Sequence, residues 1–420
     1  TCLNVGCIPS KALIEVADLA YLDSNTDDLG VEISTKVDMS KVNEHISNLV
    51  SELNSGVSFL LNKAGVDIVS GTARFSRSNR VAVENSDGGL QHFEFRDAIV
   101  ATGSSPVELA NFPIDGESTV NSASLLFQGS LPEQLTLIGG GYIGVELATA
   151  FAKLGSHVVI VELEDQLLPG FNKNLSKKLE DGLRSLGVGI CLGYEAISFD
   201  KKELMIKSND VISSIPTEIL GIVAGRRPNS EIVNITECGA SITSSGHVIV
   251  DEQRRATDHV FAIGDLTLGP ALAHKATSEA KVAADSACGI PNAFDPNCIP
   301  MVVFSDPQIV TVGIDPDTNP SNQTDFNSFR FPFSASSRAK TLGDSSGFVN
   351  IVADKEGTVV GFQAIGKHVA ELAGEAALAI ETASTIEDLS VTIHAHPTLG
   401  ETIAEASLGL AGTPLHFSDK

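Results

Sequence analysis

Residues 135–162 read LTLIGGGYIGVELATAFAKLGSHVVIVE, and this stretch decides the fold of the domain that contains it. An apolar run over 135–138 is followed by a glycine cluster, by a helical pattern over 145–154 and by a second apolar run over 158–161. That order predicts a strand, a tight turn, a helix and another strand, which together form one βαβ unit.

The glycine cluster has the G-x-G-x-x-G spacing, with Gly139, Gly141 and Gly144 at its three fixed positions. The first glycine permits the tight turn, the second lets backbone N–H groups approach a pyrophosphate, and the third lets the helix pack closely on the strand. The cluster therefore indicates a dinucleotide site, whose candidate residues are Gly139, Gly140, Gly141, Tyr142, Ile143 and Gly144.

Glu162 ends the second strand of the unit. A carboxylate there can accept hydrogen bonds from a ribose diol and would repel a 2'-phosphate, which favours NAD over NADP. A solvated strand end is the alternative for Glu162. For Tyr142, a lid over the nicotinamide entrance and ordinary packing both stay open.

The composition describes a globular protein of several domains. The chain has 420 residues, enough for about three domains. A formal net charge of −25 argues against binding to nucleic acid or to an anionic membrane surface, and fits solubility, a saline cytoplasm or a basic docking partner. No apolar run approaches the ~18 residues of a membrane span. The six scattered cysteines indicate a reducing compartment, the cytoplasm or, in a eukaryote, the mitochondrial matrix.

Three further regions are visible in the pattern. Residues 10–22 predict a helix, and a stripe of apolar residues from Val42 to Leu60 predicts a longer one; both are expected to pack on a sheet. Short runs over 80–84 and 91–95, joined across Asn85-Ser86-Asp87-Gly88-Gly89, predict a hairpin. From about Cys298 the strands resume, with runs over 347–352 and 358–365 that should pair, followed by a helix near 369–382.

Cys2 and Cys7 lie in the run CLNVGCIPSK, five positions apart. A regular helix would separate them by about 7.5 Å along its axis, so a bridge requires a distorted turn, which Gly6 can allow. Pro9 suits the first turn of the helix that follows, whose N-terminal partial charge would stabilise a thiolate at Cys7. A redox pair and two unpaired bystanders are both compatible with the spacing alone.

With these residues in view, the chain resembles the flavin-dependent pyridine nucleotide-disulfide oxidoreductases. The resemblance extends over nearly the whole chain. The ordered segments that carry it are residues 1–11, 101–104, the glycine loop with Glu162, 225–229, 261–265, 271–275, 299–313 and 394–401.

This resemblance implies a redox centre at the first cysteines. Cys2 would be the interchange thiol that exchanges with the substrate disulfide, and Cys7 the charge-transfer thiol against the flavin. Lys11 would lie near the flavin N5, paired with Glu146, because a buried lysine without such a partner would lose its charge. A solvated helix residue is the alternative for Lys11.

The resemblance also implies flavin contacts from residues that precede the NAD domain in the sequence and from residues that follow it. Asp265 would reach a ribityl hydroxyl, and the start of a helix at 271–274 would direct N–H groups toward the flavin pyrimidine and favour the anion of the reduced ring. An ordinary capped helix is the alternative. The remaining candidate positions are Gly71, Ala101, Thr102, Gly103, Ser104, Gly225, Ala271, Leu272, Ala273 and His274.

His396 and Glu401 are the candidate base and its orienting carboxylate; capping of a helix alone is the alternative for Glu401. Pro397 biases His396 toward an extended conformation, and Thr398 to Glu401 has the T-x-x-E form of a capping box that would open a helix. His394, expected on the same strand face, could compete for the part of base. No further ligands lie near this pair, so no metal site is expected.

Taken together, the resemblance implies an α/β protein with FAD and NAD domains of Rossmann type and a C-terminal α+β dimerisation domain. The expected boundaries are 1–108 and 230–297 for the FAD domain, 109–229 for the NAD domain and 298–420 for dimerisation. The family's opening βαβ unit, which cradles the FAD pyrophosphate, would precede Thr1, so we expect the sequence to be partial.

The implied activity is oxidation of a dihydrolipoyl group on a protein arm, with electrons passing through Cys2 and Cys7 and FAD to NAD in a homodimer that supplies His396 across its interface. The expected partners are lipoyl domains of an acyltransferase core or a glycine-cleavage carrier protein. The alternatives are a related disulfide or mercuric reductase and, from another class, a non-catalytic NAD-binding subunit without FAD.

Overall fold

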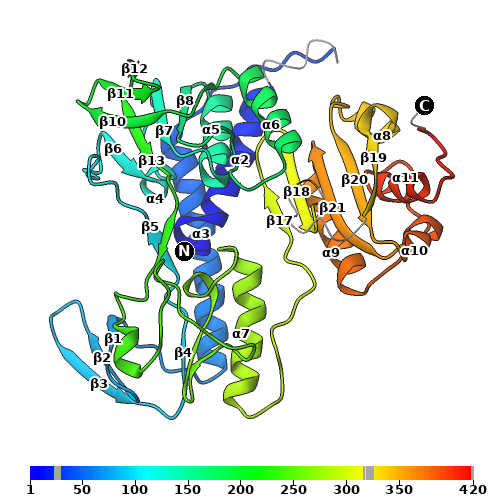
Figure 1. The fold of residues 1–420 in the computed structure, drawn as a ribbon. Coiled ribbons are helices and arrows are strands. Elements are labelled where there is room, and N and C mark those ends of the chain that lie inside the picture. Colours follow the sequence, from blue (N-terminus) through cyan, green and yellow to red (C-terminus); the bar gives the residue numbers. More distant parts are fainter. Residues whose placement is uncertain (23–29, 316, 318–325, 418–420) are drawn as a thin grey trace. The chain divides into compact units, whose positions relative to one another are not determined.

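The computed structural model describes residues 1–22, 30–315, 317 and 326–417. The chain divides into two compact units (Figure 1). The first contains Thr1–Pro9, Glu44–Glu108 and Gly225–Asp295, and the second contains Ser10–Asn43, Leu109–Ala224 and Pro296–Lys420.

A parallel five-stranded sheet forms the first half of the second unit, in the order β6-β13-β7-β8-β9. The predicted βαβ unit is confirmed, with β7 (Gln134–Ile138), α5 (Tyr142–Leu154) and β8 (His157–Glu162) in that order. These strands are apolar because a parallel sheet is covered on both faces, and every residue of the interior strand β13 (Ile219–Ile222) is buried. The other elements are β6 (Thr119–Asn121), α4 (Ser122–Leu125), α6 (Lys173–Ser185), β9 (Gly189–Leu192) and an antiparallel sheet of β10 (Glu195–Phe199), β11 (Glu203–Ser208) and β12 (Val211–Pro216).

The C-terminal part of the second unit is an antiparallel five-stranded sheet in the order β17-β18-β21-β20-β19. The two strands predicted around 355–357, β20 (Phe348–Ala353) and β21 (Val359–Gly366), pair as expected. Helices lie on this sheet (Figure 1). The buried core of this part includes Phe331, Phe362 and Ile403. Its remaining elements are β17 (Met301–Val303), β18 (Gln308–Gly313), β19 (Asn327–Pro332), α8 (Ser337–Thr341), α9 (Ala373–Glu381), α10 (Ile386–Val391) and α11 (Glu401–Leu410), with short 3-10 turns at Phe333–Ala335 and Val369–Leu372.

The first unit is built from short strands. The predicted hairpin is confirmed: β2 (Arg80–Glu84) pairs with β3 (Leu90–Glu94), and β1 (Thr72–Arg77) extends it to a meander. A second sheet has the order β15-β16-β4, and a ladder joins β5 to β14. These elements are β4 (Ala98–Val100), β5 (Ser104–Pro106), β14 (Arg226–Pro228), β15 (Arg255–Thr257) and β16 (Val260–Ala262), with α7 (Ala273–Ala287) and the 3-10 turns Ile235–Cys238 and Gly264–Leu266.

The N-terminal helices are α1 (Cys2–Val5), α2 (Cys7–Tyr21) and α3 (Met39–Lys63). The helix predicted from residue 10 therefore begins earlier, at Cys7. The apolar stripe on α3 packs only in part, because Ile46 is fully buried whereas Leu53 and Leu60 are 37% and 63% exposed. In the part of the chain that the structure describes, the stripe is buried at Val42 and Ile46 and exposed at Leu53, Val57 and Leu60, so its periodicity marks a helix face without showing what covers it. Among the described residues, no helix is both long and apolar enough to cross a bilayer.

Leu137 and Leu163 offer a matched test of the sheet. Leu137 on β7 is completely buried and Leu163, just after β8, is 67% exposed. We expect Leu137→Ala to lower the free energy of unfolding by about 2–5 kcal/mol, because it leaves a cavity between sheet and helix. Leu163→Ala should change it by less than about 0.5 kcal/mol. Denaturant unfolding followed by circular dichroism measures both, and equal losses would contradict this packing.

Candidate active site

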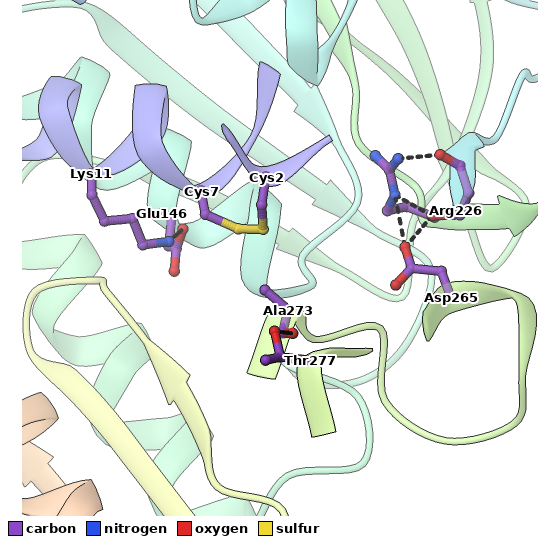
Figure 2. The surroundings of a disulfide bond; sticks show 9 residues. Cys2, Cys7, Lys11, Glu146, Arg226, Asp265, Ala273 and Thr277 are labelled. Carbon is purple, nitrogen blue, oxygen red and sulfur yellow. Dashed lines mark hydrogen bonds and ion pairs between the residues drawn. A yellow bond between two sulfur atoms is a disulfide. The ribbon is translucent and has the colours of Figure 1, made fainter. Parts of the chain in front are cut away.

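A disulfide joins Cys2 to Cys7, with their Cα atoms 4.5 Å apart. The regular helix that would hold them too far apart is broken at Gly6, whose φ of −142° and ψ of −112° end α1, and α2 starts at the next residue (Figure 2). A Cβ on Gly6 would lie 3.3 Å from the Thr1 carbonyl oxygen, so the turn is tight as well as irregular. The distorted turn expected for a bridge is present.

Cys7 is the first residue of α2, and Pro9 follows inside the first turn. The unpaired N–H groups of a helix start carry a partial positive charge. When the disulfide is reduced, this charge favours the thiolate form of Cys7 over its thiol. The position therefore suits a thiol that must act as a leaving group.

Lys11 lies one turn after Cys7 on α2 and makes an ion pair with Glu146 of α5, with Nζ 2.7 Å from Oε2 (Figure 2). The expected pairing is present. The other oxygen, Oε1, accepts a hydrogen bond from the Phe304 amide at 2.9 Å, and the Lys11 ammonium lies 4.6 Å from the centre of the Phe304 ring. Sequence reasoning missed Phe304, because a backbone donor leaves no mark in residue type.

The glycine loop is held by Glu162. Its Oε2 accepts a hydrogen bond from the Gly140 amide at 2.6 Å and its Oε1 accepts one from the Glu164 amide at 2.9 Å. Glu162 is 9% exposed, so the solvated strand end is excluded. This carboxylate fixes the loop, and the remaining lone pairs on its oxygens can still accept hydrogen bonds from a ribose.

Three glycines of the loop differ in their surroundings. A Cβ on Gly144 would overlap the Gly139 carbonyl oxygen, as expected for the position where helix and strand meet. Gly139 has φ +118° and lies against the Val223 carbonyl. A Cβ on Gly141 would meet nothing within 4 Å, and no side chain caps the helix that starts there. The open position is the one assigned to the pyrophosphate.

Asp265 follows β16 and belongs to a polar cluster of the first unit. The Ser104 hydroxyl donates to Asp265 Oδ2 and accepts a hydrogen bond from Arg226 Nε at 2.7 Å, while Arg226 Nη2 donates to the Ser104 carbonyl at 2.5 Å (Figure 2). Asn229 ties the same turn by donating to the Thr102 carbonyl at 2.9 Å. Asp265 Oδ1 makes no hydrogen bond to any residue that the structure describes. Arg226 was missed as a site residue although its segment matched the family.

Beneath Asp265 lies a buried ionic cluster centred on Glu279, which is 0% exposed. Glu279 Oε2 accepts from the Gly264 amide at 2.6 Å, and Oε1 accepts from Thr267 and Arg254 at 2.9 and 3.0 Å. Lys275 Nζ forms an ion pair with the same Oε1 at 3.2 Å. Lys275 also donates to the Gly264 carbonyl at 3.1 Å. Two residues of α7 thus hold Gly264, the residue before Asp265: Glu279 accepts from its amide, and Lys275 donates to its carbonyl. Periodicity could not reveal this cluster, although two charges four residues apart on a helix were a usable signal.

At three further predicted cofactor positions, Ala273, Gly71 and Gly225, the structure shows a role in backbone conformation or backbone hydrogen bonding. The helix expected at 271–274 starts at Ala273, after an extended Leu272, and the Thr277 hydroxyl donates to the Ala273 carbonyl at 3.0 Å (Figure 2). Gly71 has φ +155°, and a Cβ there would lie 2.6 Å from the Glu84 carbonyl oxygen. Gly225 has φ +109° and accepts a hydrogen bond from the Val107 amide at 3.0 Å.

His396 and Glu401 form a pair in the second unit, with Nδ1 2.9 Å from Oε1. Since a carboxylate only accepts, Nδ1 carries the proton and Nε2 is left as the basic atom. The His396 side chain is 72% exposed. His394, in contrast, has both ring nitrogens engaged, with Glu375 and with the Thr392 carbonyl.

Two details of this segment differ from expectation. Residues 392–400 form no strand, so no shared strand face places His394 beside His396. The capping box is incomplete: the Thr398 amide donates to Glu401 Oε2 at 2.8 Å, but the Thr398 hydroxyl donates back to the Ala395 carbonyl at 2.7 Å, and α11 begins only at Glu401. Glu401 therefore orders the loop and orients His396 at once.

Electrostatics keep Glu401 ionised. Burial acts to raise the pKa of this carboxyl, but the Thr398 amide, the hydrogen bond from His396 and the positive charges of His396 and His394 outweigh it, so the pKa is below its ordinary value. A lowered pKa means that the carboxylate persists as the pH falls, and its stabilising effect is lost only once the pH passes through that lowered value.

Two family models match this chain. Residues 1–280 match the family model described as pyridine nucleotide-disulphide oxidoreductase, and residues 299–407 match the dimerisation domain of the same family. The chain belongs to this family. It carries the family's dimerisation domain, which supports a homodimer.

This chain is similar to relatives over nearly the full length of both sequences. The chain is 39% identical to dihydrolipoyl dehydrogenase of Geobacillus stearothermophilus, covering 100% of this chain and 90% of the relative. It is 38% identical to the protein of that name from Haloferax volcanii, covering 99% and 90%. Among solved structures, LpdA from Mycobacterium tuberculosis superposes with a TM-score of 0.89 at 24% identity, over 97% of this chain and 90% of that one, and shares the fold.

FAD and NAD are the cofactors of this family, and residues of the chain fit both. The open Gly141 position at the uncapped start of α5 fits a dinucleotide pyrophosphate. The free oxygen of Asp265 and the uncapped start of α7 supply an acceptor for a hydroxyl and donors for an anionic ring. No group of three or more metal-ligating side chains occurs within the described ranges.

Gly141→Ala tests the dinucleotide loop. The added methyl meets no protein atom, so the fold should be unchanged, but it occupies the space assigned to the pyrophosphate. We expect the dissociation constant for NAD to rise by about tenfold or more, ~1.4 kcal/mol. Gly129→Ala is the matched control, because its methyl is equally unobstructed outside the loop. Unchanged NAD binding in titration calorimetry would place the pyrophosphate elsewhere.

Glu279→Gln tests the support beneath Asp265. Loss of the charge leaves Lys275 and Arg254 without their buried carboxylate, and we expect unfolding to become easier by about 3–5 kcal/mol, with FAD released during gel filtration. The control is Glu231→Gln, which removes an exposed partner of Arg227 in the same unit. If both variants retain FAD and melt alike, Glu279 does not support the flavin site.

Proposed function

We propose that this chain is a dihydrolipoyl dehydrogenase that oxidises a protein-bound dihydrolipoyl group and reduces NAD. The observation that carries the proposal is the Cys2–Cys7 disulfide across the broken helix start, in a chain 39% identical to enzymes of that name. Lipoyl domains of an acyltransferase core or of a glycine-cleavage carrier protein are the proposed partners. The sparse, scattered cysteines favour the cytoplasm as the compartment.

The dithiol reacts at Cys2. A substrate thiolate attacks the Cys2 sulfur, the bond between Cys2 and Cys7 breaks, and Cys7 leaves as a thiolate that the start of α2 stabilises. The product is a mixed disulfide between substrate and Cys2. The second substrate thiol then attacks the substrate sulfur that is bonded to Cys2. The cyclic disulfide forms, and Cys2 leaves.

His396 moves the protons. Its Nε2 takes the proton from the first attacking thiol and gives it to the departing Cys2 sulfur. It then holds the proton of the second substrate thiol, so the reduced centre has a Cys2 thiol, a Cys7 thiolate and a protonated His396. Glu401 holds Nδ1–H and stabilises the imidazolium. The high exposure of His396 suits a base that serves a dithiol approaching across the homodimer interface.

The ion pair with Glu146 holds the Lys11 ammonium in place one helical turn beyond Cys7. FAD, which Asp265 and the start of α7 would hold, would supply an acceptor for the electron pair of the reduced cysteines and a donor of hydride to NAD. The Lys11 ammonium would offer a fixed positive charge to the reduced ring, and the Phe304 amide holds Glu146 so that the ion pair keeps its direction.

The paired variants Cys7→Ser and Cys2→Ser test this assignment in the FAD-loaded homodimer. Cys7→Ser should lose the long-wavelength thiolate-to-flavin absorption on reduction, whereas Cys2→Ser should show it without any dithiol, because the Cys7 thiolate is then permanently free. Both should lose NAD-linked oxidation of dihydrolipoamide. Retention of the absorption band and of turnover in Cys7→Ser would overturn the proposal, and absence of turnover in the unmodified enzyme would remove the activity itself.

A further inference from the structure

His394 and His396 are two positions apart, and each faces a glutamate, but their hydrogen bonds differ. His394 Nε2 lies 2.7 Å from Glu375 Oε1, and its Nδ1 lies 3.0 Å from the Thr392 carbonyl oxygen. A carbonyl and a carboxylate can only accept hydrogen bonds, so both ring nitrogens of His394 must donate. Both hydrogen bonds form together only when both nitrogens carry a proton, as they do in an imidazolium.

A cationic ring has no lone pair and cannot act as a base. The His394 side chain is 10% exposed and its carboxylate partner comes from α9, so the ring is held in place on both edges. His396 has one nitrogen engaged by Glu401, and its Nε2 makes no hydrogen bond within the described chain. The competition between the two histidines is therefore decided by their partners.

We propose that His394, held as a cation by Glu375 and the Thr392 carbonyl, is a positioning residue for His396, and that it supplies the fixed positive charge beside the His396–Glu401 pair. The inference rests on the proposed function. It adds a second histidine–glutamate pair whose task is to set the geometry and the basicity of the first.

Packing connects the two pairs. A Cβ on Gly400, directly before α11, would lie 3.4 Å from His394 Cδ2 and 3.9 Å from Glu375 Oε2. The Glu375–His394 pair therefore lies against the backbone that presents Glu401. The pair links α9, the segment over 392–396 and the start of α11, so a change at His394 is transmitted to the base through one short stretch of chain.

The charge of His394 also acts on its neighbours. The titratable groups around it come from three elements: Glu375 on α9, His396 on the same segment and Glu401 on α11. The positive charge of His394 is one of the causes that lower the pKa of Glu401. The same charge opposes the gain of a second positive charge on His396, which makes its proton easier to return to the leaving thiol.

The test is His394→Gln in the FAD-loaded homodimer. Loss of the cation leaves Glu375 without its countercharge, and both changes favour protonated His396. We expect the acid limb of the pH profile for dihydrolipoamide oxidation to move upward by roughly half a pH unit. At neutral pH, kcat/KM should fall roughly tenfold, well short of the loss of about 10²- to 10⁴-fold expected from removing the base itself. Reduction of ferricyanide by NADH, which needs no dithiol, should be retained.

His416→Gln is the matched control. His416 pairs with Glu405 of α11 at 2.6 Å, so this variant removes another histidine–glutamate pair from the same domain. The acid limb should stay where it is. An unmoved limb in His394→Gln, or an equal shift in both variants, would overturn the proposal and leave His394 with a structural role only.

A second measurement covers the case in which His394→Gln does not fold. In enzyme labelled with ¹⁵N-histidine, the ring nitrogens of His394 should show the shifts of an imidazolium at neutral pH, and Glu375→Gln should abolish that signal. A neutral His394 in the unmodified enzyme would refute the proposal. This signal does not depend on turnover, so loss of the activity proposed for the enzyme would be recognised separately.

Discussion

A carboxylate taken out of water needs donors on both oxygens, and four glutamates of this chain meet that need beside functional segments. Glu146 receives Lys11 and the Phe304 amide, and Glu162 receives the Gly140 amide of the glycine loop and the Glu164 amide. Glu279 receives an amide, a hydroxyl and two cations. Glu401 receives the Thr398 amide and His396. Each glutamate uses its charge to hold a turn of backbone next to a reacting group or a cofactor.

The redox pair depends on a different local device. Two cysteines five apart cannot bridge within one regular helix, and the chain meets this requirement by ending α1 at Gly6 and starting α2 at Cys7. The same break places the second sulfur at a helix start, where a thiolate is favoured. One glycine thus serves the geometry of the oxidised state and the electrostatics of the reduced state.

In the last domain, the hydrogen-bond partners of each histidine ring decide its chemistry more than its position in the sequence does. His394 and His396 are near neighbours in sequence, and residue type alone left His394 as a competitor for the part of base. The Thr392 carbonyl and Glu375 engage both nitrogens of one ring, and Glu401 engages a single nitrogen of the other. Because both pairs lie against residues 398–401, the segment is one unit in which geometry and charge are set together.

The sequence by itself determined the βαβ unit around Gly139 to Gly144, the hairpin after Arg80 and the pairing of β20 with β21, because alternation, glycine sterics and turn chemistry act over a few residues. The Lys11–Glu146 pair was also predictable, but only through resemblance to a family. Tertiary structure alone decided that Glu279 holds the residue before Asp265, that the Phe304 amide holds Glu146 and that both ring nitrogens of His394 have partners. These depend on atoms brought together from distant parts of the chain, and hydrogen bonding between such atoms leaves no periodic trace in the sequence.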